Sequence, residues 1–204
     1  MDPTHDHTHD HAHEMGGLNA MAVAATLHCL TGCAIGEIVG LVIGTAVGLG
    51  NGATIALSVA LAFAFGFTLS SLPLLRAGLT LGATLSVVVA ADTLSIATME
   101  VVDNAVMALI PGAMDAGLVN VLFWVGMAIS LAVAFLAALP VNRYLLQRGK
   151  GHALTHEYHH TDPASTDVTG TRRLIPSFAS STLVAVLSAF MLGGLVVSVA
   201  ERLG

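Results

Sequence analysis

Long apolar runs constrain the fold of this chain more than any other feature of its sequence. Five segments are dominated by apolar and small residues: residues 18–49, 53–75, 79–110, 119–146 and 178–200. A helix that crosses a membrane needs about 20 such residues. Only 10% of the side chains are charged, against roughly a quarter in soluble domains. We therefore expect an all-α, polytopic transmembrane helix bundle with about five spans, embedded in a lipid bilayer.

Polar segments flank these spans. Residues 1–17 lack an apolar pattern and are predicted to form a disordered tail that is rich in histidine: His5, His7, His9, His11 and His13. Residues 150–177 are predicted to form a polar cytoplasmic loop with four more histidines: His152, His156, His159 and His160. Neutral imidazoles on either segment can chelate Zn, Ni, Co or Cu loosely. The predicted segments are thus the tail 1–17, helices one to four over 18–149, the loop 150–177 and a last helix over 178–204.

Turn-forming residues separate the spans. Asn51-Gly52 predicts a turn after the first span, and Arg76-Ala77-Gly78 closes the second. The Pro- and Gly-containing stretch 111–117 ends the third span. With five spans, six of the seven basic residues fall on one side of the membrane: Arg76, Arg143, Arg148, Lys150, Arg172 and Arg173. That side should be cytoplasmic, so we expect a cytoplasmic N-terminus and a C-terminus outside.

The first span carries thiol, imidazole and carboxyl groups close together. Cys29, Cys33 and Glu37 are four residues apart and form one row on a helix, with His28 beside them. Thiolates suit Cu(I) or Zn, and imidazole suits Zn, Cu or Ni. The alternative is that the cysteines are small packing residues and that His28 is a satisfied interior histidine. A further alternative is that His28 is an axial ligand of a haem group.

The same span carries five glycines at strict four-residue spacing: Gly32, Gly36, Gly40, Gly44 and Gly48. Small residues at this spacing let a second helix approach closely. We expect this glycine ladder to pack against a partner helix, or against another copy of the chain in a homo-oligomer.

The third span carries three acidic residues. Asp92, Ser95, Met99 and Asp103 follow a three-to-four spacing, and Glu100 lies on the next row. An ionisable group inside a membrane costs about 2.5 to 3.5 kcal/mol on insertion scales. No lysine or arginine is placed to neutralise these groups, which leaves protons, a cation or polar donors. Alternatively, Glu100 and Asp103 reach the membrane surface. Asp115 is expected to be a solvated turn residue.

Several motifs resemble those of the domain-of-unknown-function 4396 family. They are His28-Cys29-x-x-Gly32-Cys33-x-x-Gly36-Glu37, Thr98-Met99-Glu100-x-x-Asp103-Asn104, Pro111-Gly112-x-Met114-Asp115, and Pro140-x-Asn142-Arg143 with Arg148-Gly149-Lys150-Gly151-His152. The resemblance covers about residues 24–160. It implies a multi-pass protein of the prokaryotic inner membrane, and it implies no reaction.

These observations predict a membrane protein that binds, and transports or delivers, a metal cation such as Cu, Zn, Ni or Co. The predicted ligands are His28, Cys29, Cys33, Glu37, Asp92, Met99, Glu100 and Asp103. Two alternatives remain open: proton-coupled transport of another small solute, and a non-catalytic assembly subunit. No basic cluster predicts a nucleic-acid partner. The sequence also lacks a phosphate-binding loop with lysine and a Gly-x-Ser-x-Gly element, so no catalytic residue is predicted.

Overall fold

The computed structural model describes residues 7–148 and 174–203, with side chains from Gly17 onward. These residues form five long α-helices: α1 (His7–Ala46), α2 (Asn51–Ala77), α3 (Leu81–Leu109), α4 (Val121–Gln147) and α6 (Ser180–Leu203). All five are long and apolar enough to cross a membrane. The predicted all-helical, five-span architecture is therefore confirmed.

The ends of the helices differ from the expected spans in two respects. α1 begins at His7 and so includes much of the segment that we expected to be disordered. Extending an existing helix costs less free energy than nucleating one, and the membrane part of α1 supplies that nucleus. The expected turn at Asn51-Gly52 is wrong, because both residues belong to α2. The chain turns earlier, where Gly48 has a φ of 71°.

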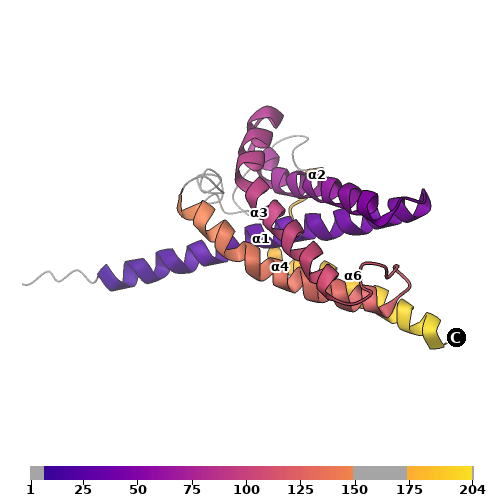
Figure 1. Ribbon diagram of the computed structural model, residues 1–204. Helices are drawn as coiled ribbons and strands as arrows, with labels where there is room; N and C mark the ends of the chain where they lie inside the picture. Colours follow the sequence, from indigo (N-terminus) through magenta and orange to yellow (C-terminus); the bar gives the residue numbers. More distant parts are fainter. Residues whose placement is uncertain (1–6, 149–173, 204) are drawn as a thin grey trace, which may run out of the picture.

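α1 is the central helix and packs against each of the other four. α2 returns antiparallel beside α1, α3 crosses the bundle, and α4 runs back along the other side of α3 (Figure 1). α6 lies against α1 and α4. Because a single helix separates α1 from α3 in the chain, these two run in the same direction.

The glycine ladder of α1 holds α2. Each of these glycines faces one residue of α2, with which an added Cβ atom would collide. The pairs are Gly32 with Gly66, Gly36 with Ala62, Gly40 with Ser58 and Gly44 with Thr54. The partner helix of the ladder is therefore α2 of the same chain. Gly48 lies outside this contact, in the turn, with nothing within 4 Å of an added Cβ. A homo-oligomer formed through the ladder stays a prediction.

A buried hydrogen bond joins α4 to α1, and a close aromatic contact joins α4 to α6. The Asn142 amide on α4 donates a hydrogen bond of 2.8 Å to the Thr26 hydroxyl on α1. The Trp124 indole on α4 donates a hydrogen bond of 2.7 Å to the Leu118 carbonyl. The same indole ring packs directly over Gly194 of α6. Close packing at Gly194 thus docks α6 onto α4.

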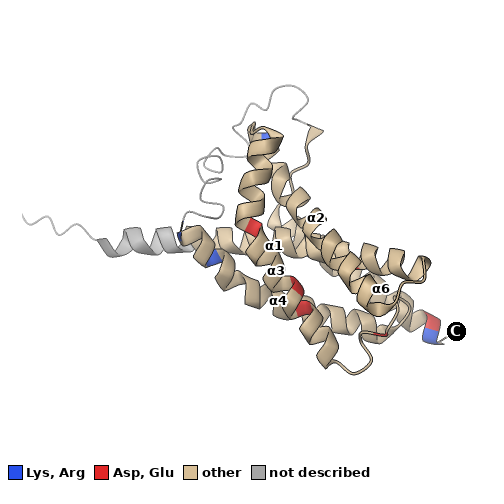
Figure 2. Cartoon of the chain, turned by 45° about the horizontal axis from the view of Figure 1, so that its top comes forward, with Lys and Arg blue, Asp and Glu red and all other residues tan. Residues whose placement is uncertain are grey.

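Charged residues are distributed unevenly along the helices. Figure 2 shows acidic residues in the middle of the bundle and basic residues near the helix ends. Arg76 donates to the Ile175 carbonyl, Arg148 stacks over Tyr144 and Arg202 donates to Asn120. The histidines of the predicted polar loop, His152, His156, His159 and His160, lie outside the described residues, as do Lys150, Arg172 and Arg173.

Candidate intramembrane cation site

Six acidic and thiol side chains lie along the interface of α1 and α3. We call them the acid–thiol row: Cys29, Cys33 and Glu37 from α1, with Asp92, Glu100 and Asp103 from α3. The two helices run in the same direction, so residues at similar intervals on each come level with one another. On α1 the members of the row are four residues apart, which keeps them on one face of the helix. On α3 they are eight and three residues apart.

The first end of the row lies around Cys29 and Asp92. Cys29 is fully buried beside Ser70 of α2 and Ser95 of α3, with the Asp92 carboxyl group nearby. Asp92 also lies next to Ser70 and near His28. The His28 Nδ1 atom is 2.9 Å from the Ala24 carbonyl, which leaves Nε2 as the ring nitrogen available to a ligand.

The middle of the row joins Cys33 to Glu100. The Cys33 thiol lies beside the Glu100 carboxyl group, with Cys29 and Glu37 close by. Both cysteines are free thiols. Cys33 is 1% exposed and Glu100 is 3% exposed, so the alternative in which Glu100 reaches the surface is wrong.

The other end of the row brings three helices together. The Glu37 carboxyl group of α1 lies beside that of Asp103 on α3, and Asp103 also lies next to the Ser130 hydroxyl of α4. Asp103 is 5% exposed and is likewise not at the surface. The row therefore runs through the interior from Asp92 to the pair Glu37 and Asp103.

The carboxyl groups of the row are poorly satisfied. Within the described part of the chain, buried oxygen atoms without a hydrogen-bond partner occur on each of the four acids: Glu37 Oε1, Asp92 Oδ2, both Glu100 carboxyl oxygens and Asp103 Oδ1. Buried polar atoms in folded proteins nearly always have a partner, so each exception asks for an explanation such as an ion, a water or a proton. In the part of the chain that the structure describes, no basic side chain bonds to these oxygen atoms.

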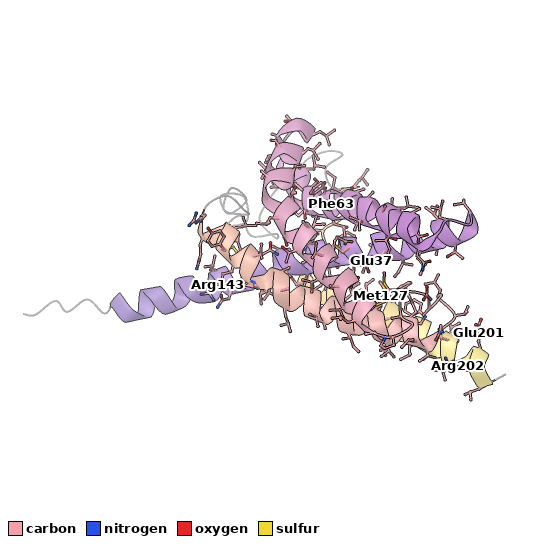
Figure 3. The ribbon with its side chains drawn as sticks, in the orientation of Figure 1. Glu37, Phe63, Met127, Arg143, Glu201 and Arg202 are labelled. Carbon is pink, nitrogen blue, oxygen red and sulfur yellow. The ribbon has the colours of Figure 1, made fainter. Side chains whose placement is uncertain are left out.

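A cavity of about 160 Å³ reaches the Glu37 and Asp103 end of the row. We call it the loop-end cavity, because it extends to Leu49 and Asn51 at the α1–α2 turn and to Met114 in the α3–α4 connection. Figure 3 shows Glu37 and Met127, which both line this cavity, inside the bundle, and Glu201 and Arg202 at the far end of α6. The exposed Asn51 amide, at the start of α2, donates a hydrogen bond of 2.8 Å to the Asp115 carboxyl group. This bond links α2 to the α3–α4 connection beside the cavity.

The acid–thiol row does not form a ready-made metal centre. Among the described side chains, those of residues 17–148 and 174–203, no three or more histidine, cysteine, aspartate or glutamate side chains are grouped so that they could hold a metal ion. The predicted ligands instead meet mainly in pairs, such as Cys33 with Glu100 and Glu37 with Asp103. Met99 is buried in the apolar core.

A family model described as "Domain of unknown function (DUF4396)" matches residues 18–151, which is more than half of the chain. The chain belongs to this family. The resemblance seen in the sequence motifs is thereby confirmed, and the match covers the whole acid–thiol row of this DUF4396 protein. Neither a curated protein nor a solved structure is significantly similar to it.

Sequence reasoning missed the contributions of α2 and α4 to the DUF4396 site. Ser70 of α2 lies beside Cys29 and Asp92, and Ser130 of α4 lies beside Asp103. The signal for α2 was present as small residues at four-residue spacing, complementary to the glycine ladder: Thr54, Ser58, Ala62, Gly66 and Ser70. Ser130 and Met127 carry no comparable pattern, because α4 is apolar on all sides.

Proposed function

We propose that this protein is a membrane transporter for a metal cation, with the acid–thiol row as its path through the bundle and protons as the counter-charge. The observation that carries this proposal is the set of buried carboxyl oxygens without a partner on Glu37, Asp92, Glu100 and Asp103. Four such acids in one interior row have no structural use that apolar side chains would not serve better.

Electrostatics limits what these groups can do. A carboxylate or thiolate in a medium of low dielectric constant is stable only beside a positive charge, and otherwise takes up a proton. Metal binding requires deprotonated ligands and therefore releases protons. The row would thus hold either protons or a cation, which is the exchange that a proton-coupled metal transporter needs.

The chemistry of the pairs favours a transition metal over Na⁺ or Mg²⁺. Cys33 with Glu100 offers one soft sulfur ligand and one carboxylate, and Cys29 adds a second sulfur one helical turn away. Cu, Zn, Ni or Co accept such ligands. Because only pairs are preformed in the described residues, binding would require α1 and α3 to shift so that further ligands approach.

Metal content of the purified protein tests this proposal. The five tail histidines are first replaced by alanine in the full-length chain, which removes the loosest chelating group. We expect about one metal ion per chain to remain, and the Cys33→Ser/Glu100→Gln variant to lose it. Glu201→Gln, at the exposed end of α6, is the control. If the metal content of the protein depends only on the tail histidines, the intramembrane path is refuted.

Proton-coupled transport of another small solute is the second candidate. It is favoured by the finding that the described residues hold no preformed group of three metal ligands. In that case Glu37, Asp92 and Glu100 would carry protons and the cysteines would serve packing alone. Solute uptake would support this candidate over the first if it meets three conditions. It must depend on pH, be unaffected by metal chelators and be retained in the Cys29→Ala/Cys33→Ala variant.

A further inference from the structure

The geometry points to the loop-end cavity as a loading site for a soft monovalent cation, Cu(I) or its analogue Ag(I). This inference rests on the proposed function, because it names the class of cation that the acid–thiol row would carry. It adds a site that the sequence did not indicate, built from methionines of three separate segments.

Thioether sulfurs and a buried acid line the same cavity. Met107 of α3, Met114 of the α3–α4 connection and Met127 of α4 all line it, together with Glu37 and Asp103. Met127 is 2% exposed and Met107 is 9% exposed. A Cβ atom built on Gly126 would lie 3.1 Å from the Met107 sulfur, so this sulfur packs against α4 at the residue next to Met127 in the chain.

An unsatisfied acid marks the inner end of this cavity. Asp103 is buried, lines the cavity and has a buried oxygen without a hydrogen-bond partner in the described structure. A cation seated there would satisfy that oxygen. Methionine can fill apolar gaps without binding anything, but filling a gap gives no reason for a carboxyl group to face the same space.

The ligand chemistry selects the cation. Soft thioether and thiolate ligands select Cu(I), whereas Mg²⁺, Ca²⁺ and Mn²⁺ prefer oxygen donors. Thioethers carry no charge, so one carboxylate is enough to neutralise a monovalent ion at this depth. From the Glu37 and Asp103 end, the next sulfur along the row is Cys33, beside Glu100. The cation would therefore pass from thioethers to thiols.

Binding of Ag(I) to the full-length protein in detergent tests this site, with Cys29→Ser/Cys33→Ser as the background so that thiols do not mask the thioethers. We expect Met107→Leu/Met127→Leu to weaken Ag(I) binding at least tenfold, which is roughly the loss caused by removing even a supporting partner of a metal ligand. Zn(II) binding should change less than about twofold, since thioethers contribute little to a Zn site. Met191→Leu on α6 is the matched control.

The outcomes separate this inference from the proposed function. Methionine and leucine have similar volumes, and the helical content by circular dichroism confirms that each variant folds. Equal Ag(I) affinity in Met107→Leu/Met127→Leu and in the background would overturn the loading site. If Zn(II) still binds and depends on Glu37 and Asp103, the proposed metal function survives that result. If neither Ag(I) nor Zn(II) binds the protein with both cysteines in place, both fail.

Discussion

The Glu37 carboxyl group on α1 faces the Asp103 carboxyl group on α3 at the inner end of the loop-end cavity. Two acids that share a buried site cannot both be ionised without a cation between them. Under the proposed function, the pair would switch between a protonated state and a cation-bound state. The cavity gives the pair contact with the loop end of the bundle. In the proposed transporter, the pair would act as the gate between the cavity and the row.

Metal binding at this gate should depend on pH. Protons compete with the cation for the same oxygens, so affinity should rise as pH rises. In Glu37→Gln/Asp103→Asn this dependence should shrink, because amides do not titrate in this range. Titration of Ag(I) or Zn(II) in weakly acidic and weakly alkaline buffers measures it. An unchanged pH dependence in the double variant would place the competing protons elsewhere.

Removing a row acid should not weaken the fold. Neither carboxyl oxygen of Glu100 has a well-formed hydrogen bond in the described structure, and the Cys33 thiol is the polar group beside it. Glu100→Gln therefore removes an ionisable group and disturbs at most a weak contact with that thiol. We expect the Tm in detergent to stay equal or to rise by up to about 3 °C. Glu201→Gln is the exposed control. A Tm that falls by more than this amount would reveal a buried partner that stabilises the carboxylate.

The α1–α2 contact should be sensitive to a single methyl group. A Cβ atom at Gly36 would collide with the Ala62 backbone, whereas one at Gly52 meets nothing within 4 Å. Gly36→Ala should therefore lower the free energy of unfolding by about 1 to 3 kcal/mol, since backbone atoms must separate. Gly52→Ala should be neutral or slightly stabilising. Equal stability of the two variants, measured by thermal unfolding, would disprove this packing.

The hydrogen bond between Asn142 and Thr26 should couple α4 to α1. Thr26→Val and Asn142→Leu each leave one buried partner unsatisfied. A double-mutant cycle should give a coupling energy of about 0.5 to 2 kcal/mol. The variants Thr45→Val and Gln147→Leu, which change polar side chains outside this pair, serve as the control cycle with no coupling. A coupling energy near zero at Thr26 and Asn142 would mean that the bond contributes nothing.

The sequence predicted the helices well because apolar length and turn residues act locally. Gly78, for example, closes α2 with a φ of 108° in the left-handed region, as the Arg76-Ala77-Gly78 segment indicated. The α1–α2 turn was misplaced because Asn-Gly is a common turn signal, while Gly48 and Gly50 offered the chain an earlier turn. The glycine ladder predicted a close helix contact, but the spacing alone does not say which helix fills it.

The candidate site was only half predictable from the sequence. Helical spacing identified Cys29, Cys33 and Glu37 as one row, and the cost of buried charge singled out Asp92 and Glu100. The pairing of Cys33 with Glu100 depends on how α1 and α3 cross, which no local pattern specifies. The same holds for the cavity, where Met107 and Met127 meet only through tertiary packing.

The most direct test of the acid–thiol row is proton movement during metal uptake by proteoliposomes. The protein is reconstituted with a pH-sensitive dye inside the vesicles, and metal is added outside under conditions where protein-free vesicles show no change. We predict a metal-dependent proton flux that is abolished in Glu37→Gln/Glu100→Gln and retained in Glu201→Gln. Metal uptake or proton flux that is unaffected by the loss of Glu37 and Glu100 would contradict the account.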